Sequence, residues 1–237
     1  LSFPRDLYVS IAGTNRKDRI NSAYKVNEPQ RLVQTIQNNF YIPIDHYIQI
    51  DFCAFKVLVD AVGGVAVPFE YPVRDSGSGL NIPEAGCHNF SGDEALDYVR
   101  SRKFQWLNPD TNKWQSDNGY DYGRIARQQD FLRRAVAKVV SQGPFDLGVA
   151  QGLIDVAQNY VVTDPELTIG KQLEFAGVLK NIDAAQIHSY RVEGTGQRIA
   201  GNDVIVPTLK TDNMVAILAI FRGSAALESA PEQAVVA

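Results

Sequence analysis

The chain carries arginines in short clusters, and these clusters are its strongest candidates for a binding site. Arg100 and Arg102 flank one serine, and two more arginines lie between Arg124 and Gln128. Arginine presents a planar fork of N–H donors that binds phosphate oxygens in pairs and stays charged at any working pH. Several converging arginines suit a doubly charged diphosphate better than a single carboxylate. The pattern therefore predicts a site for a diphosphate.

The spacing within each cluster favours convergence. If the chain is extended around Ser101, the arginines on its two sides share one face. On a helix that begins near Gly123, Arg124 and Gln128 are i,i+4 neighbours, with Arg127 beside them. These side chains would lie in the first helical turns, where free backbone N–H groups and the helix dipole favour an anion.

Two further arginines are candidates, and several acids offer an alternative explanation for all of them. Arg5 stands in Pro4-Arg5-Asp6, at a transition from strand to loop, and Arg19 is a weaker candidate. Each arginine of the two clusters has a neighbouring acid with which it can form a surface ion pair: Asp97, Asp121 and Asp130. Asp6 and Asp121 are also candidate general bases, although a loop aspartate beside an arginine is more often a turn or ion-pair residue.

Other catalytic patterns are weak in this sequence. The histidines His46, His88 and His188 are scattered, and His46 alternates with isoleucines, as a strand residue does. Ser91 resembles a helix cap rather than a nucleophile. The sequence has no Gly-x-Ser-x-Gly elbow, no Walker loop and no Gly-x-Gly-x-x-Gly fingerprint.

Composition bounds the class of protein. The 237 residues are 45% hydrophobic and 21% charged, which is typical of a globular protein. The net charge of −4 argues against a large basic surface for nucleic acid. No apolar run approaches the ~18 residues that cross a bilayer, and the start of the sequence at Leu1 does not resemble a signal peptide.

The two cysteines, Cys53 and Cys87, leave two interpretations open. Their spacing matches no zinc site, which needs four ligands in close pairs. They form either one disulfide, which would place the protein outside the cytosol, or two buried free thiols.

Helical and strand patterns alternate along the chain. Apolar spacing and caps predict helices over 28–40 with Asn27 as the N-cap, from Asp51 to Gly63-Gly64, over 93–99, over 124–140, from Asp164-Pro165 onward, and over 212–221. Strands are predicted over 3–11, 44–50, 65–67 and 187–192, and a long surface loop over 103–122. The alternation indicates one α/β domain over 1–222, with helices on both faces of a mixed sheet, and a flexible tail over 223–237.

Six motifs in order resemble one family. They are Ser2-Phe3-Pro4-Arg5-Asp6, Arg19-Ile20-Asn21-Ser22-Ala23-Tyr24, Ile42-Pro43-Ile44-Asp45-His46-Tyr47, Leu58-Val59-Asp60-Ala61-Val62-Gly63-Gly64-Val65, Ala95-Leu96-Asp97-Tyr98-Val99-Arg100-Ser101-Arg102 and Asp121-Tyr122-Gly123-Arg124 through Gln128-Gln129. The series is similar to the LytR-CpsA-Psr family, whose members are membrane-anchored on the outside of Gram-positive and actinobacterial cells. The resemblance implies a three-layer α-β-α fold with an apolar pocket for a polyprenyl tail.

The resemblance also implies an activity. Such proteins transfer a glycopolymer, such as teichoic acid or arabinogalactan, from a polyprenyl diphosphate carrier to peptidoglycan through a phosphodiester. The expected partners are therefore the lipid-linked polymer, the peptidoglycan acceptor and the membrane, with no nucleic acid. A lipid-diphosphate binding or scaffold protein, and a polyprenyl-diphosphate hydrolase, are the alternatives.

The resemblance assigns roles to individual residues. Diphosphate-binding positions of the family fall on Arg5, Arg100, Arg102, Arg124 and Gln128, with Arg127 adjacent and with Arg19 where lysine is commoner. Arg5, Arg100, Arg102, Arg124 and Asp121 are the expected catalytic residues. Mg²⁺ is expected, but its acids and the N-terminal membrane anchor would precede Leu1, so we expect an N-terminally truncated chain. The extracytoplasmic location favours a disulfide between Cys53 and Cys87. The Trp-bearing segment 103–119 resembles an insertion that either flanks the acceptor glycan or packs onto the domain.

Overall fold

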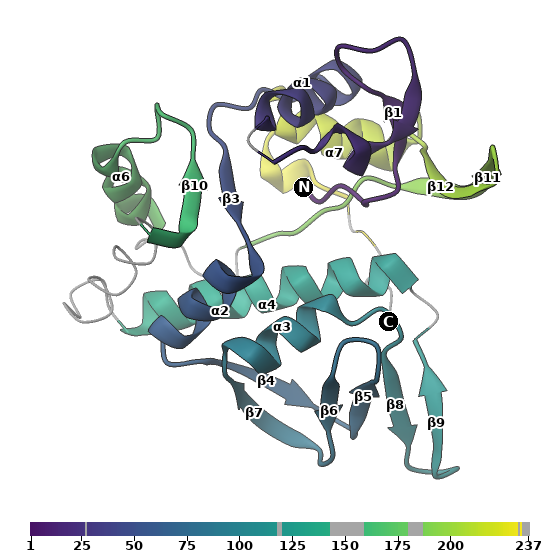
Figure 1. The fold of residues 1–237 in the computed structure, drawn as a ribbon, viewed down its shortest axis with the longest axis vertical. Helices are drawn as coiled ribbons and strands as arrows, with labels where there is room; N and C mark the ends of the chain where they lie inside the picture. Colours follow the sequence, from purple (N-terminus) through teal and green to yellow (C-terminus); the bar gives the residue numbers. More distant parts are fainter. Residues whose placement is uncertain (27, 118–119, 143–158, 180–186, 232, 234–237) are drawn as a thin grey trace. The chain divides into compact units, whose positions relative to one another are not determined.

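The structure, a computed structural model, describes residues 1–26, 28–117, 120–142, 159–179, 187–231 and 233. They form the predicted α/β fold (Figure 1). The chain divides into two compact units, of which the first combines Leu1–Tyr47 with Ser189–Ala234 and the second consists of Ile48–His188 with Val235–Ala237. We call them the terminal unit and the central unit. The predicted end of a functional domain at residue 222 stays a prediction.

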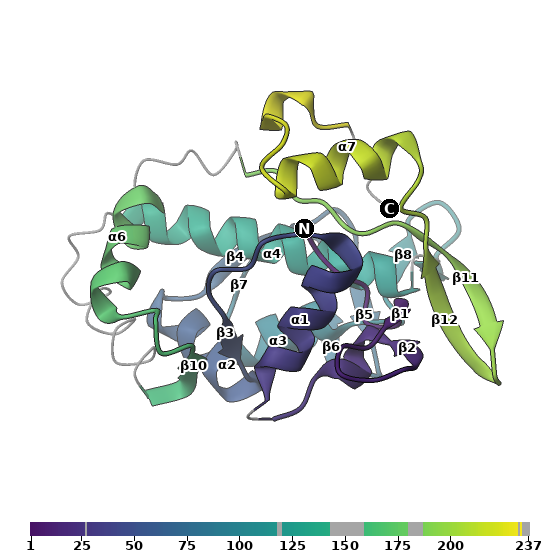
Figure 2. The ribbon, with the colours of Figure 1, turned by 90° about the horizontal axis from the view of Figure 1, so that it is seen from above.

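The terminal unit is built from two antiparallel hairpins and two long helices (Figure 2). Its elements are β1 (Tyr8–Ser10), β2 (Lys17–Arg19), the 3-10 helix η1 (Ile20–Ala23), α1 (Pro29–Phe40), β11 (Gly194–Ile199), β12 (Asn202–Pro207), α7 (Asp212–Phe221) and the 3-10 helix η3 (Leu227–Ser229). Isolated parallel bridges join Ser2 to Arg191 and Leu7 to Ile205, so both ends of the chain contribute to this unit. The strand predicted over 187–192 is thus only a bridge at Arg191.

Local signals and one apolar core explain the terminal unit. Helix α7 has the predicted bounds, and its N-cap Thr211 accepts a hydrogen bond from the backbone N–H of Met214. Helix α1 begins with Pro29, and the predicted cap Asn27 lies outside the described residues. The buried core gathers Leu7, Val9, Ile11, Ile20, Ala23, Phe40, Tyr190, Val192, Met214, Ile217 and Leu218. In the segment predicted to be a flexible tail, the Gln233 amide forms two hydrogen bonds with the backbone of Arg191.

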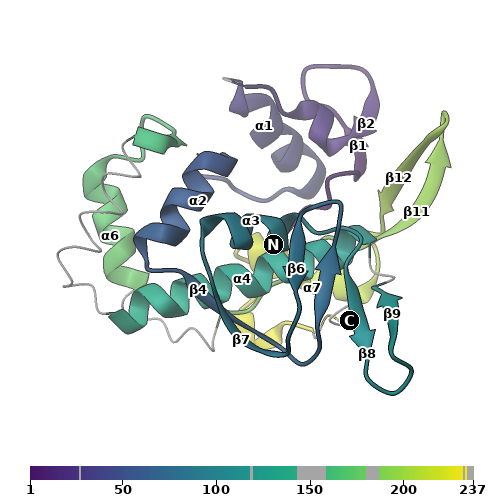
Figure 3. The same cartoon turned by 60° about the horizontal axis from the view of Figure 1, so that its bottom comes forward.

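The central unit carries most of the candidate site. Its elements are β3 (Ile48–Ile50), α2 (Phe52–Ala61), β4 (Val65–Phe69), β5 (Val73–Asp75), β6 (Leu80–Ile82), β7 (Gly86–Phe90), α3 (Gly92–Arg100), β8 (Gln105–Asn108), β9 (Lys113–Ser116), α4 (Tyr120–Gln142), β10 (Val161–Thr163) and α6 (Ile169–Leu179). The strands pair antiparallel as β3–β10, β4–β7 and β6-β5-β8-β9. Figure 3 shows β4 beside β7, and β8 beside β9. Parallel pairing among the described residues is limited to the two bridges of the terminal unit.

Three sequence predictions for the central unit are wrong. The segment 103–122 is not a surface loop, because β8 and β9 form a hairpin that pairs with β5. The helix expected from Asp164-Pro165 begins at Ile169, because the Asp164 carboxylate accepts hydrogen bonds from the N–H groups of Glu166 and Leu167 in a turn. The strand expected over 44–50 is shortened to β3, which pairs with β10.

An aromatic core stabilises the central unit. Tyr98 of α3 packs its ring against Phe69, Phe90 and Phe131, with ring centroids 5.6–6.4 Å apart. Burial raises the pKa of Tyr98 to about 12. Its hydroxyl therefore stays protonated at neutral pH and belongs to the core rather than to acid–base chemistry. None of the helices described here has the length and apolar character that crossing a membrane requires.

Candidate diphosphate-binding site

Helix α3 positions the first arginine cluster. A capping box starts the helix, since Glu94 accepts hydrogen bonds from the N–H (2.9 Å) and hydroxyl (2.8 Å) of Ser91. Gly92 follows, where a β-carbon would collide with the backbone carbonyl of Lys56. Glycine thus lets α3 approach α2 closely, and Arg100 ends the helix.

Arg100 and Arg102 contact different residues, and the extended chain on which their predicted shared face depends is not observed at Arg100. Arg100 is still helical, whereas Ser101 leaves the helix with φ −56° and ψ 127°. The Arg100 guanidinium lies 4.8 Å from the ring centroid of Phe52, in a cation–π contact. Arg102 instead extends to Asp121. The two side chains therefore have different partners.

Asp97 lies one turn before Arg100, and its carboxyl group is a weaker acid than that of an ordinary aspartate. Burial raises the pKa of Asp97, the charge of Arg100 opposes this rise, and the charge of Asp93 adds to it. Asp130, the other acid considered for ion pairing, forms its pairs with Arg133 and Arg134 farther along α4.

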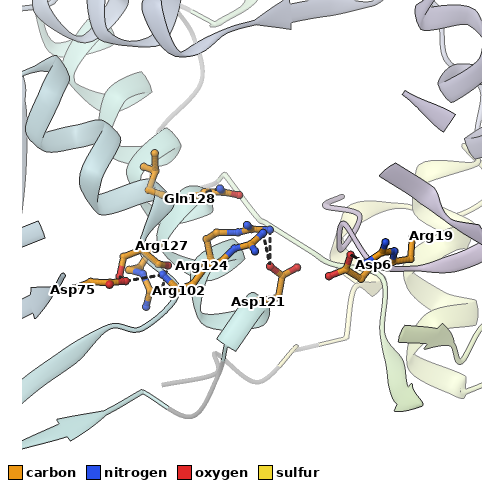
Figure 4. Close-up of polar contacts among 10 residues, drawn as sticks. Asp6, Arg19, Asp75, Arg102, Asp121, Arg124, Arg127 and Gln128 are labelled. Atoms are coloured by element: carbon orange, nitrogen blue, oxygen red, sulfur yellow. Dashed lines mark hydrogen bonds and ion pairs between the residues drawn. The ribbon is translucent and has the colours of Figure 1, made fainter. Parts of the chain in front are cut away.

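A carboxylate between two guanidiniums forms the centre of the site (Figure 4). Asp121 Oδ1 pairs with Arg124 Nη2 and lies 3.8 Å from Arg102 Nη2. The side chains of Arg124 and Asp121 are 14% and 18% exposed, whereas that of Arg102 is 46% exposed. Among the described residues, Asp121 Oδ2 is buried and has no hydrogen-bond partner. We call Arg102, Asp121 and Arg124 the Asp121 cluster.

Helix α4 begins earlier than predicted, and this changes the electrostatic argument. Its first residue is Tyr120 and not a residue near Gly123, so Asp121 occupies the first turn. The free N–H groups and the positive end of the dipole therefore act on Asp121. Arg127 and Gln128 lie a turn or more farther along, where the backbone N–H groups already have helical partners.

Arg127 and Gln128 direct their donors into the protein. Arg127 Nη1 pairs with Asp117 Oδ2 at 2.9 Å, and its Nη2 donates to the Ser101 carbonyl at 2.7 Å. The same guanidinium lies 4.6 Å from the ring centroid of Phe104, and Arg127 is only 9% exposed. Gln128 Nε2 donates to the carbonyl of Val99 at 3.0 Å. Both residues link α4 to the end of α3.

Arg5 and Arg19 belong to the terminal unit. Arg5 is exposed in a turn, and its carbonyl accepts a hydrogen bond from the N–H of Asn21. Arg19 ends β2, and its Nη1 lies 3.8 Å from Asp6 Oδ1 (Figure 4). That these two arginines act on the same ligand as the Asp121 cluster stays a prediction.

The predicted disulfide is absent. Cys53 and Cys87 are both free thiols with exposed side chains. Cys53 lies in the first turn of α2, and Cys87 lies in β7 opposite Pro68. Each points to solvent from its own element, so the alternative of two free thiols holds, although they are not buried.

The expected Mg²⁺ has no ligand set in the described part of the chain. Within those residues no group of three or more His, Cys, Asp or Glu side chains could hold a metal ion. Asp6 of the terminal unit and Asp121 of the central unit each pair with an arginine. The residues at hand therefore do not fit a metal site of their own.

Two acids that contact the candidate site residues were not predicted from the sequence. Asp117, which pairs with Arg127, lies in the segment interpreted as a loop, and no local pattern identifies it. Asp75, which contacts the turn after α3, ends a three-residue strand. Its only signal is the sequence Asp75-Ser76-Gly77, an aspartate at a position typical of turns.

The described fold is thus an α/β fold in which two guanidiniums of the central unit lie on one carboxylate. The chain belongs to the LytR_cpsA_psr family, which matches residues 1–220. This confirms the resemblance carried by the six motifs.

Named relatives share much of the chain. It is 35% identical over 201 residues to the polyisoprenyl-teichoic acid–peptidoglycan teichoic acid transferase TagU of Halalkalibacterium halodurans, covering 84% of this chain and 59% of the relative. It is 32% identical to TagV of Bacillus subtilis, a transferase of the same name, covering 79% of this chain and 46% of the relative. The chain thus spans about half the length of these two relatives.

A solved structure confirms the fold. The LytR-Csp2A-Psr enzyme from Actinomyces oris superposes with a TM-score of 0.72 over 92% of this chain and 78% of its own. The sequences are 24% identical, so this similarity establishes the α/β fold of the family and no more.

Proposed function

We propose that this chain is a phosphotransferase that moves a glycopolymer phosphate from a polyprenyl diphosphate carrier to peptidoglycan. The observation that carries the proposal is the Asp121 cluster, in which two guanidiniums lie on one carboxylate at the start of α4. The transferase names of TagU and TagV support this choice among anion-binding functions. The expected place of action is the outer face of the cell membrane.

The reaction exchanges one phosphorus–oxygen bond for another. The bond between the two phosphates breaks, a sugar hydroxyl of the acceptor bonds to the polymer-linked phosphorus, and polyprenyl phosphate leaves as an anion. Phosphoryl transfer depends on positioning and charge stabilisation more than on a covalent nucleophile. Arg102 and Arg124 would hold the diphosphate and stabilise the charge on the leaving phosphate.

Asp121 would act on the acceptor. Its Oδ1 is engaged by the arginines, while Oδ2 has no hydrogen-bond partner within the described residues. As the diphosphate takes over Arg102 and Arg124, the Asp121 carboxylate would be released from its ion pairs and would accept the proton of the sugar hydroxyl as the new bond forms. A general base must lie within hydrogen-bond reach of the proton that it takes.

The polyprenyl tail would contact apolar side chains of the central unit. Strand β3, strand β10 and helix α6 expose large apolar residues that are about half accessible: Ile48, Ile50, Val162, Ile169, Leu173, Phe175 and Val178. Apolar surface of this extent favours an apolar ligand. The enclosed pocket of the family remains part of the proposal.

The test is a transfer reaction with the polyprenyl-diphosphate-linked polymer and peptidoglycan fragments, run with and without Mg²⁺. Release of polyprenyl phosphate together with a new sugar–phosphate bond supports the proposal. Arg102→Ala and Arg124→Ala should abolish transfer. Arg133→Ala is the matched control. The Arg133 side chain is about as exposed as that of Arg102 (43% against 46%) and lies on α4 as Arg124 does, but it pairs with Asp130. Tight binding without turnover would indicate a lipid-diphosphate binding protein instead, and release of polyprenyl phosphate with free polymer phosphate but no peptidoglycan conjugate would indicate a hydrolase.

A further inference from the structure

The turn that follows α3 is held by one buried carboxylate. Asp75, at the end of β5, is 2% exposed. Its Oδ2 accepts three hydrogen bonds: from Ser101 Oγ (2.7 Å), from the N–H of Arg102 (2.8 Å) and from the N–H of Lys103 (2.7 Å). Its Oδ1 accepts a fourth from the N–H of Gly77 at 2.8 Å.

The opposite side of the same turn is held from α4. The carbonyl of Ser101 accepts a hydrogen bond from Arg127 Nη2, and Ser101 itself is fully buried. The segment is therefore held by hydrogen bonds on two sides. Its backbone N–H groups donate to Asp75 of β5, and its Ser101 carbonyl accepts from Arg127 of α4. Charge-assisted hydrogen bonds of this kind are shorter and stronger than neutral ones.

The Arg102 side chain leaves this fixed segment toward solvent, as the Lys103 side chain does, but it is the Arg102 guanidinium that lies close to Asp121. The Arg102 backbone N–H is bound to Asp75, while its guanidinium, on a half-exposed side chain, lies 3.8 Å from Asp121. The guanidinium is at the end of a long side chain, and the position of the Arg102 backbone sets the region that it can reach. A shift of this backbone therefore shifts the point at which the guanidinium meets a ligand. Asp75 fixes the position of this backbone.

We propose that Asp75 is a positioning residue for diphosphate binding, acting through the backbone of Arg102. It holds the turn so that the Arg102 guanidinium meets Arg124 across Asp121. The inference rests on the proposed function, because it concerns the same ligand. A positioning role can be told apart from a general contribution to folding. If Asp75 only supported the fold, its substitution would weaken binding equally with and without the Arg102 guanidinium.

Asparagine is the informative substitution at this position. Asp75→Asn keeps the shape, but one of its two terminal atoms is an N–H₂ donor. Placed at Oδ2 this donor would face three donors, and placed at Oδ1 it would face the N–H of Gly77. Either orientation loosens the turn.

The experiment measures the dissociation constant of farnesyl diphosphate in a double-mutant cycle of Asp75→Asn and Arg102→Ala. Near-UV circular dichroism checks the fold of each variant. We expect Asp75→Asn to weaken binding about tenfold, the size of one charge-assisted hydrogen bond. In the Arg102→Ala background the same change should have no effect. Asp110→Asn is the matched control, because it removes one exposed charge of the β8–β9 hairpin.

Each outcome has one meaning. An equal loss in both backgrounds, or no loss in either, overturns the positioning role while leaving the proposed site intact. If Arg102→Ala itself binds like the original chain, the proposed site fails, and the role of Asp75 fails with it. Should Asp75→Asn not fold, Ser101→Ala removes a single bond to the same carboxylate and replaces it in the cycle.

Discussion

Replacing Arg127 by alanine should destabilise the protein rather than remove a ligand contact. The guanidinium pairs with Asp117, donates to the carbonyl of Ser101 and packs on the ring of Phe104. The two charged side chains are 10% and 9% exposed, so water cannot replace these contacts freely. The family resemblance placed Arg127 beside the diphosphate, whereas its contacts are those of a clamp between α4 and the end of α3.

The magnitude follows from these contacts. Hydrogen bonds to charged groups contribute about 1.5–3 kcal/mol each, and a cation–π contact about 0.5–2 kcal/mol. Against this, Arg127 Nε is buried without a partner within the described residues, which already costs about 1–3 kcal/mol. Asp117 also retains a further interaction, so it is not left isolated. The net loss should be about 2–4 kcal/mol, close to the value for breaking a buried ion pair.

Urea unfolding followed by circular dichroism measures this loss, with farnesyl diphosphate binding measured in parallel. A loss of this size lowers Tm by about 5–12 °C in a protein of this length. Arg102→Ala is the reciprocal control, because its exposed pair should contribute less than about 1 kcal/mol to stability while its loss weakens farnesyl diphosphate binding. An Arg127→Ala variant that keeps its stability but no longer binds the diphosphate would refute the clamp and favour direct contact.

Three other predictions concern the same unit. Alanine for glycine normally stabilises a helix by about 1 kcal/mol, but Gly123→Ala should destabilise α4 in urea, because its β-carbon would collide with the Asp117 carboxylate. Burial alone would raise the pKa of Asp75, yet four hydrogen bonds to Lys103, Ser101, Gly77 and Arg102 outweigh it and lower the pKa below 3.8. The stability that Asp75 contributes should therefore be complete above pH 3.8 and disappear as pH falls through the lowered pKa, so unfolding curves of the original chain and Asp75→Asn should converge in acid. Finally, Cys53 and Cys87 should both react with a thiol reagent without prior reduction, and failure of both to react would support the disulfide instead.

Elements marked by local side-chain signals were predictable from the sequence. The predicted bounds of α7 match the structure to the residue, and a cap at Thr211, which was not predicted, starts this helix. Asp51, predicted as a cap, accepts a hydrogen bond from the N–H of Ala54 at 2.8 Å and starts α2. The Ser91 capping box starts α3 in the same way. In each case the signal and the structure lie within four residues of one another, so no tertiary contact is needed to interpret it.

The β8–β9 hairpin was not predictable, because its stability comes from distant residues. Its strands are short and rich in polar residues, which locally resemble a loop. The pairing partner β5 lies some thirty residues earlier in the chain, where Val73 pairs with Trp106. On β5, Arg74 places its guanidinium 4.0 Å from the ring centroid of Trp114. Trp106 packs against the core of the unit, as one of the two interpretations of this segment proposed.

The sequence identifies the arginines, but only burial and pairing decide which of them can meet a substrate. A guanidinium whose donors are held by Asp117 and a backbone carbonyl must break those bonds before it binds anything else, and Arg127 is in this position. Arg102 has a half-exposed side chain and, within the described residues, one ion pair at 3.8 Å, so we expect a diphosphate, with more charge than one carboxylate, to compete for it at low cost. Arg124 shares that carboxylate, so a ligand that reaches Arg102 at Asp121 reaches Arg124 as well. The proposed site therefore depends on the two arginines that share Asp121, and Arg127, with its donors held inside the unit, is expected to support their position.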